Sequence, residues 1–428
     1  MNFKLALAAA AVVGFAGSAQ AADLAKKAPA AANYVKVCDA YGAGFFYIPG
    51  SDTCLKIGGF VRAEYRIMDR TSANSPALGA AFGWGGANSR GMTGIFTRSR
   101  VGLNFDARTN TEMGLLRSYI DFWLTADSAG NGNANTNLTG VGLATTQPLW
   151  LRKAFVQFAG VTAGRATSFF DFYTGSNTNS VFHVAASDAD VNLLAYTFAF
   201  GNGITASLSL EDSSSSDEAN TASVGFGGRR LNGLYAGVKS TDIVANVNVA
   251  QSWGSAQVMA ALHDNYSSFI AGGVDDNRWG YAIGGGVKVN LPMLGAGDVL
   301  GLQAAYSKGA MEYVNGGGWY ANAAWRDFYT GAGTIDQSTA WSVVAGLTHN
   351  WTKTVASSIT GSYASFDAPA SAGTIDFKQT DLQGNVVWKP VAGLALSANV
   401  EYRYVDRDPS VGADGGAYVG FLRVERQF

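Results

Sequence analysis

The sequence contains little cysteine, histidine and proline, and few charged residues. Its 428 residues include 2 Cys, 3 His and 8 Pro, and charged residues make up 14% of the chain with a formal net charge of −2. Two cysteines without a histidine at ligand spacing argue against a metal site. A near-neutral chain also lacks the basic surface that neutralises phosphates, which argues against a nucleic-acid partner. We therefore expect no metal, no other cofactor and no nucleic-acid ligand.

Long apolar runs are absent after the N-terminus. Residues 1–21 combine a basic start at Lys4, an apolar centre over residues 5–15 and the small-residue sequence Ala19-Gln20-Ala21. This combination is typical of a secretory signal peptide that is cleaved after its last alanine. No later run reaches the roughly 18 consecutive apolar residues that a membrane helix needs. The sequence therefore predicts an exported chain without a helical anchor.

The two cysteines, Cys38 and Cys54, enclose the short segment CDAYGAGFFYIPGSDTC, which is rich in glycine and aromatic residues. An exported protein meets an oxidising compartment, in which a pair of cysteines usually forms a disulfide. We therefore predict a disulfide between Cys38 and Cys54.

Glycine and aromatic residues are abundant, with 54 Gly, 24 Phe, 18 Tyr and 10 Trp. Over residues 55–67, apolar side chains alternate with polar ones that include Arg62, Glu64 and Arg66. Strict alternation is typical of a strand with one apolar and one polar face. The same pattern recurs at residues 98–108, 116–124, 393–405 and 416–428.

The connections between the predicted strands alternate between long and short along the whole chain. Long connections include residues 68–95, 126–148 and 308–338, whereas residues 109–113 and 201–203 form short ones. All long loops then lie on one side of an up-and-down sheet, as they do in outer-membrane barrels. A soluble sandwich would also alternate in polarity, but these loop lengths favour a barrel.

The runs give 16 strands, each roughly as long as the 9–11 residues that cross a bilayer when tilted. A barrel of this size encloses an aqueous lumen, and in lipid the sheet must close because an open edge would leave backbone groups unpaired. We predict an all-β fold, a 16-stranded antiparallel transmembrane β-barrel over residues 55–428. A mature N-terminal segment over residues 22–54 precedes it.

One long connection, residues 168–190 with the sequence SFFDFYTGSNTNSVFHVAASDAD, is predicted to fold into the lumen and narrow it. It carries Asp171, Asp188 and Asp190 among aromatic and small polar residues. Its histidine, His183, fits a polar loop residue better than a pH gate, although histidine titrates in a suitable range.

The chain resembles the alphaproteobacterial general porin family of Gram-negative outer membranes. The resemblance is strongest over residues 34–62, YVKVCDAYGAGFFYIPGSDTCLKIGGFVR, and continues in Ala163-Gly164-Arg165 before the inward loop and in a last strand that ends at Phe428. It implies a homotrimeric, water-filled channel in outer-membrane lipid and lipopolysaccharide, with the third long loop folded inward. It also implies that Phe428 belongs to the signal that the barrel-assembly machinery reads. One departure is Arg426, which alternation directs towards lipid.

A porin selects solutes by size and by the electric field at its narrowest point. We expect the loop acids Asp171, Asp188 and Asp190 to face basic residues of the wall. Arg165 is the first candidate, because its Gly-Arg context resembles the arginine at the constriction of general porins. The other candidates, from alternation, are Arg62, Arg66, Arg98, Arg100 and Arg117. Each arginine could instead pair with a nearby carboxylate away from the constriction.

Catalytic patterns are weak. The three histidines, His183, His263 and His349, fall in the inward loop, near an outer rim and near a periplasmic turn, so a Ser-His-Asp group is not expected. The glycine run at residues 284–286 falls inside a predicted strand and lacks the helix start of a phosphate loop. The sequence therefore predicts a protein that is not an enzyme.

We expect an outer-membrane porin that passes small hydrophilic solutes and ions by passive diffusion. Three alternatives stay open: a solute-specific channel, a surface-binding or adhesive barrel with a blocked lumen, and a secreted soluble β-protein. Open conductance separates the first two functions from the adhesive barrel, and partition without detergent would identify the soluble protein.

Overall fold

The computed structural model describes residues 36–69, 95–127, 149–177, 182–212, 235–236, 239–268, 274–315, 325–373, 375–408 and 414–428. The predicted signal peptide lies outside the described residues, as does the first part of the predicted N-terminal segment. No helix in the described part of the chain is long and apolar enough to span a membrane.

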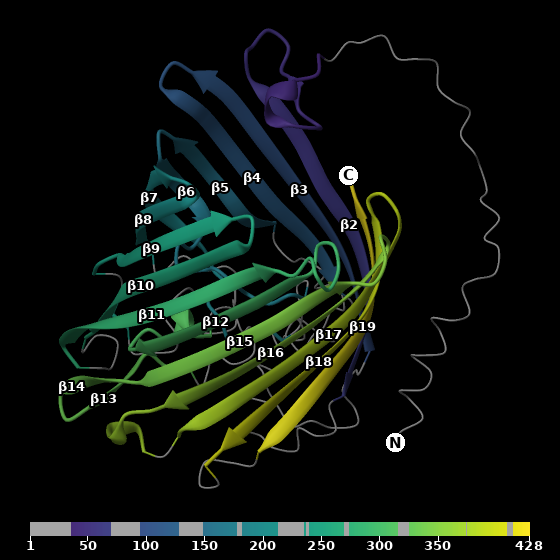
Figure 1. Cartoon of the computed structure of the whole chain (residues 1–428). Coiled ribbons are helices and arrows are strands. Elements are labelled where there is room, and N and C mark those ends of the chain that lie inside the picture. Colours follow the sequence, from purple (N-terminus) through teal and green to yellow (C-terminus); the bar gives the residue numbers. More distant parts are fainter. Residues whose placement is uncertain are drawn as a thin grey trace, which may run out of the picture.

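Sixteen antiparallel strands form a closed barrel, which confirms the predicted fold (Figure 1). Neighbours along the chain pair around the ring, and the last strand pairs with the first long one to close it. The barrel strands are β2 (Cys54–Asp69), β3 (Ile95–Thr111), β4 (Gly114–Asp127), β5 (Trp150–Phe158), β6 (Val161–Thr167), β7 (Asp190–Gly201), β8 (Ile204–Glu211), β9 (Asp242–Gln251), β10 (Gly254–Ser267), β11 (Asp276–Asn290), β12 (Val299–Lys308), β15 (Thr339–Asn350), β16 (Val355–Asp367), β17 (Phe377–Val391), β18 (Leu394–Arg407) and β19 (Gly415–Gln427).

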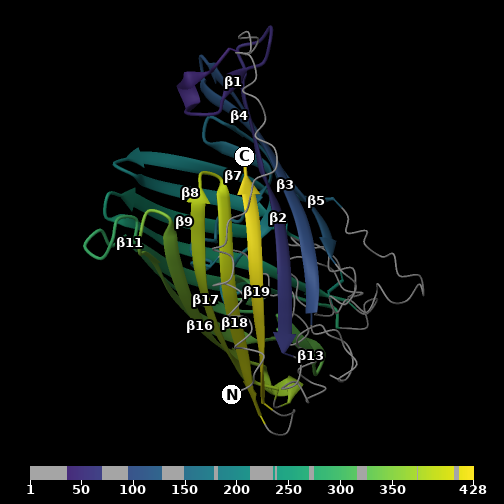
Figure 2. The same cartoon turned by 90° about the vertical axis from the view of Figure 1, so that its right-hand side faces the viewer.

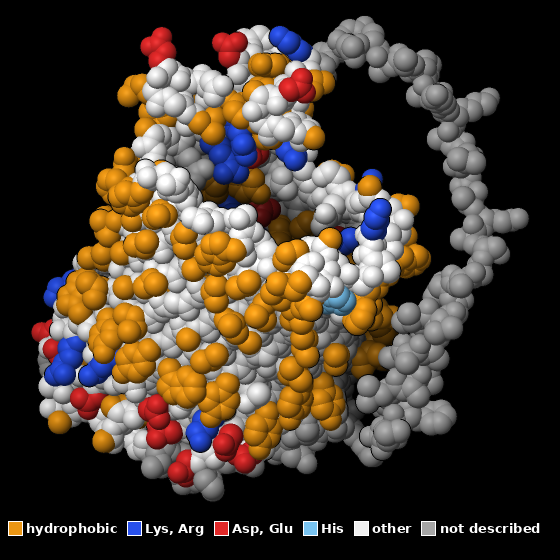
Figure 3. All heavy atoms as spheres, viewed as in Figure 1, with side chains coloured by type: hydrophobic (Ala, Val, Ile, Leu, Met, Phe, Trp, Pro, Cys, Tyr) orange, Lys and Arg blue, Asp and Glu red, His pale blue; other side chains and the backbone are white. Residues whose placement is uncertain are grey.

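Alternation along the strands sorts side chains between the two faces of the wall. In β2, Val61 and Tyr65 are exposed on the outer face, whereas Arg62, Glu64 and Arg66 are buried on the inner face. Figure 3 shows hydrophobic side chains spread over the outer wall, with charged ones at the rims and inside the opening. An apolar outer wall suits lipid, and the polar inner face suits water.

Short turns join the strands at one end of the barrel, here called the short-turn rim. Ala159 and Gly160 join β5 to β6, and Asn202 and Gly203 join β7 to β8. All four residues have φ between +48° and +86°, as tight hairpin turns require. A Cβ atom at Gly203 would lie 1.9 Å from a carbonyl oxygen of β9, so only glycine fits there.

The N-terminal segment extends the short-turn rim beside β2, as Figures 1 and 2 show. It contains the 3-10 turn η2 (Asp39–Tyr41), the short strand β1 (Phe46–Tyr47) and the predicted disulfide between Cys38 and Cys54, which is confirmed. The edge of β2 is paired with β19 down to Gly59, which exchanges two backbone hydrogen bonds of 3.1 Å with Phe428. Beyond that point β1 pairs with β2 and covers its edge.

The long connections lie at the opposite end, the long-loop rim. They contain the hairpin of β13 (Phe328–Gly331) and β14 (Thr334–Gln337) and the 3-10 turns η5 (Met311–Tyr313) and η6 (Ala370–Ala372). The hairpin pairs only within itself among the described strands, so β12 pairs directly with β15 in the wall.

Candidate functional site: the interior of the barrel

Residues 168–177 and 182–189, between β6 and β7, lie inside the barrel against its inner wall; together we call them the inner loop. Its first part runs along the inner faces of β10, β12 and β16. The amide of Tyr173 donates to Gln303 (2.8 Å), and the amide of Ser176 donates to Thr360 (2.9 Å). These contacts hold the loop across the lumen from the strands that precede and follow it in the chain.

The second half of the inner loop reaches β17 and β18 and then returns. The amide of Phe182 donates to Glu401 (2.8 Å), and the buried Arg403 donates to the carbonyl of His183 (2.5 Å). The amide of Ala185 donates to a serine of β16 (3.0 Å). Side chains from β8, β9, β10, β12, β16, β17 and β18 therefore hold the described parts of the loop along its path.

The three predicted acids of this region have different surroundings. Asp171 accepts hydrogen bonds from Ser187 and from the amide of Ala189 (2.6 Å), so it joins the two halves of the loop. Asp190, at the start of β7, is buried and accepts from Arg152 (3.0 Å). The carboxylate of Asp188 is partly exposed.

Asp188 has 41% of its side chain exposed and lies 3.7 Å from the imidazole of His183. Enclosure by the barrel acts to raise the pKa of the Asp188 carboxyl. The hydrogen bond from His183 and the charges of Arg152 and Lys153 outweigh it and hold this pKa below its usual value. The inner loop therefore carries a fixed negative charge beside β5.

The wall that faces this part of the loop is basic. Arg62, Arg66 and Arg100 are buried on the inner faces of β2 and β3, as predicted by alternation. Arg98 faces Glu64 across the β2–β3 ladder and lies in the same row. Glu64 bridges Arg66 to Arg423 of β19, whose guanidinium is 2.7 Å from the Glu64 carboxylate.

Two basic residues that alternation did not select, Arg152 and Lys153, add to this wall from β5. Their side chains are 24% and 28% exposed, more than those of the arginines on β2. Arg152 lies 3.0 Å from Asp190 and 3.9 Å from Asp121, and Lys153 lies 3.7 Å from Asp190. These two residues present the most accessible positive charges beside Asp188.

Arg117 lies apart from this group, towards the short-turn rim. It donates to both carboxylate oxygens of Asp106 (2.9 and 3.0 Å) and to Gln157 (3.1 Å). Asp106 also binds Arg108, at 2.7 Å. Arg117 thus has the arrangement of a lumen arginine paired with a nearby carboxylate.

Arg165, the first candidate, is not brought into the basic wall. The register aligns it with Ala154 of β5 and Asn192 of β7. The neighbouring row, one residue away along each strand, contains Phe155 and Leu193, which pack together inside the barrel. Because successive residues of a strand face opposite sides, the row of Arg165 faces outward. This position does not fit the pore-lining role that the Gly-Arg context suggested.

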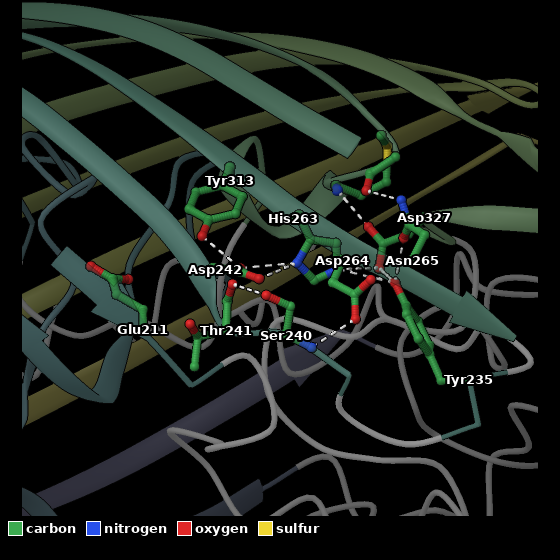
Figure 4. A network of polar contacts seen from close by, with 12 residues as sticks. Glu211, Tyr235, Ser240, Thr241, Asp242, His263, Asp264, Asn265, Tyr313 and Asp327 are labelled. Carbon is green, nitrogen blue, oxygen red and sulfur yellow. Dashed lines mark hydrogen bonds and ion pairs between the residues drawn. The ribbon is translucent and has the colours of Figure 1, made fainter. Parts of the chain in front are cut away.

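A buried network holds two long connections against β9 and β10 (Figure 4). His263 Nδ1 lies 2.9 Å from both oxygens of Asp242, and its Nε2 lies 3.1 Å from the hydroxyl of Tyr235 and 4.0 Å from Asp327. The single proton of the Tyr235 hydroxyl has two acceptors at 2.8 Å, Asn265 and Asp327, besides Nε2 of His263. Tyr313 donates to Asp242 (2.7 Å).

This network also supports the inner loop. Tyr313 belongs to the connection after β12, and its ring meets that of Phe170 edge to face at 4.7 Å between centroids. Both residues belong to a buried cluster inside the barrel. The fixed position of one connection therefore stabilises the loop that crosses the lumen.

A closed barrel with an apolar outer wall, a polar and charged interior and a loop held across the lumen defines a membrane channel. Comparison with known proteins identifies the kind of channel. A family model described as a porin subfamily matches residues 23–419, and the chain belongs to this porin family.

Relatives and solved structures agree with this assignment. The chain is 27% identical over 435 residues to Porin Omp2b of Brucella suis biovar 1 and 26% identical to Porin Omp2b of Brucella abortus, with 100% of both chains covered in each case. Its fold is similar to that of the outer membrane channel DcaP of Acinetobacter baumannii, with a TM-score of 0.64, 15% identity and 89% and 99% of the two chains covered. Salmonella typhi OmpF is similar at a TM-score of 0.52 and 10% identity, with 89% and 99% covered.

The protein is therefore an outer-membrane porin, through which solutes diffuse passively, and not an enzyme. The short-turn rim of such a barrel faces the periplasm and the long loops face outward.

Proposed function

We propose that the narrowest part of the channel lies between Asp188 on the inner loop and Arg152 and Lys153 on β5. The observation that carries this proposal is the exposure of these three opposed charges next to a loop that is held across the lumen. Opposite charges on facing walls set a transverse field, which acts strongly in a narrow passage between low-dielectric walls. Small hydrophilic solutes and ions are the substrates that such a passage admits.

We also propose a preference for anions. The wall beside the inner loop contributes seven basic side chains, against four acids on the wall and Asp188 on the inner loop, which leaves a formal charge of +2. The basic residues are Arg62, Arg66, Arg98, Arg100, Arg152, Lys153 and Arg423, and the acids are Glu64, Asp121, Asp190, Glu425 and Asp188.

Single-channel recording in a planar bilayer with a salt gradient tests both statements. Arg152→Ala should move the reversal potential towards cation selectivity, and Asp188→Asn should move it the other way. Lys378→Ala is the matched control, because Lys378 is exposed at the outer end of β17. Unchanged reversal potentials in both test variants would overturn the proposed constriction. A folded barrel without any openings would instead support a surface-binding role.

We further propose that the porin is a homotrimer whose contact includes the outward row of Arg165. Arg165 donates to the carbonyl of Leu151 (2.9 Å), but an arginine on the lipid face still costs about 2–4 kcal/mol near the bilayer midplane, and burial against a neighbouring subunit would lower that cost. Arg165→Glu should convert trimers to monomers on electrophoresis without boiling. An unchanged trimer band would place the contact elsewhere on the wall.

We propose that the exposed ring of Phe428 at the short-turn rim is read by the barrel-assembly machinery, after export through a signal peptide over residues 1–21, and that lipopolysaccharide surrounds the long-loop end. Phe428→Ala should lower the amount of assembled barrel in cells but leave refolding in detergent intact. Equal assembly in cells would refute the role of Phe428.

A further inference from the structure

Trp123 occupies the centre of the basic wall. It lies on the inner face of β4 and is 5% exposed. The guanidinium carbons of Arg152, Arg100 and Arg62 lie 4.3, 4.5 and 5.8 Å from its ring. These arginines come from three different strands, β5, β3 and β2, so one aromatic ring connects basic side chains that are distant in the sequence.

Other aromatic rings fix the orientation of Trp123. Phe60 and Trp150 meet it edge to face, with centroids at 5.6 and 5.3 Å and interplanar angles of 84° and 87°. Edge-to-face contacts of this kind are favourable and fix ring geometry. The ring is therefore held by its neighbours and does not depend on the arginines for its position.

We propose that Trp123 is a positioning residue that sets the ion selectivity of the channel by helping to hold Arg152, Arg100 and Arg62 in place. A cation within about 6 Å of an indole ring is attracted by the ring quadrupole. Arg152 also pairs with Asp190 and Arg62 with Glu425. The ring adds a contact that fixes the guanidinium groups and adds no negative charge of its own.

The same barrel contains the alternative arrangement for comparison. Near the short-turn rim, Asp106 holds Arg108 and Arg117 by direct ion pairs of 2.7 and 2.9 Å. Two cations there share one anion, which lowers the local charge. At Trp123 three cations contact one neutral ring, in addition to the carboxylate partners of Arg152 and Arg62. The ring therefore helps to fix the positions of these arginines without adding a further negative charge to the wall.

This inference rests on the proposed role of the basic wall in selectivity. Trp123→Leu should lower the anion-to-cation permeability ratio roughly two- to fivefold, the scale of one lost cation–π contact. The formal charge of the channel is unchanged by this substitution. Trp123→Phe keeps an aromatic ring and should restore most of the ratio. Trp388→Leu is the matched control, because Trp388 is 50% exposed on the outer face of β17.

The outcomes separate the two proposals. Reversal potentials would be measured for refolded barrels whose strand content and resistance to heat in detergent match those of the parent. If Arg152→Ala changes the ratio and Trp123→Leu does not, the role of Trp123 is refuted while the basic wall stands. If neither changes it, the basic wall itself is refuted. A loss in Trp123→Leu that Trp123→Phe does not restore would indicate a packing effect and overturn the positioning role.

Discussion

Replacing His263 with glutamine removes the imidazole at the centre of the buried network. His263, Asp242 and Asp327 are all fully buried, so the variant leaves two carboxylates without the ring that faces both of them. A buried carboxylate that loses its partner costs about 3–5 kcal/mol, because it is desolvated and uncompensated. We expect a loss of this size in the free energy of unfolding.

His349 provides the matched control. Its Nδ1 lies 2.5 Å from Asp298, but its side chain is 27% exposed at the short-turn rim. The Asp298 carboxylate is buried but also accepts hydrogen bonds from the amide and the side chain of Asn350 (2.8 and 3.2 Å), so it keeps donors when the imidazole is removed and His349→Gln should cost only about 1 kcal/mol. The two variants make the same chemical change in different degrees of burial.

Urea unfolding of the barrel in detergent, followed by tryptophan fluorescence, gives the two losses. Asp242→Asn combined with His263→Gln should cost less than the sum of the single variants, because the two side chains are direct partners. Equal losses for His263→Gln and His349→Gln, or strict additivity in the double variant, would refute the role of the His263 imidazole as the partner of buried carboxylates.

The disulfide, one turn and one rim carboxylate give three further tests. Replacing Cys38 and Cys54 with serine should lower the free energy of unfolding by about 3 kcal/mol, and an unchanged urea midpoint would contradict this. Gly203→Val should abolish refolding, since its Cβ would overlap a backbone oxygen; a normal yield of heat-resistant barrel would be the contrary result. The amide of Asn350 lowers the pKa of Asp298, so the stability that this carboxylate contributes is present above about pH 4 and lost as pH falls through the lower folded value. Asp298→Asn should therefore flatten the loss of stability in acid.

The strands and the inward arginines of β2 and β3 could be predicted because long, regular strands keep strict alternation. Arg62 and Arg66 are four residues apart in β2 and Arg98 and Arg100 are two apart in β3, so each pair shares the inward face of its strand. The disulfide could be predicted from export and from the presence of only two cysteines.

The same reasoning from alternation fails for irregular or short strands. The pairing of β4 with β5 shifts register between Asp121 and Phe122, which lets the adjacent residues Arg152 and Lys153 both reach the lumen. Alternation predicts that neighbours point to opposite faces, so no pattern in the sequence would select both. Arg165 was chosen from its context and not from alternation, because β6 has only seven residues. Trp123 gave no sequence signal, since its partners come from other strands.

The seam between β2 and β19 joins residues that are more than 350 positions apart, and two ion pairs cross it: Arg62 with Glu425 and Arg423 with Glu64. The charges that face the solute therefore also hold the barrel closed. A substitution at these positions that changes ion selectivity also weakens the pairing of β2 with β19. We expect viable changes of selectivity to accumulate at Arg152, Lys153 and Asp188, which lie away from the seam, while the seam charges change only in compensating pairs.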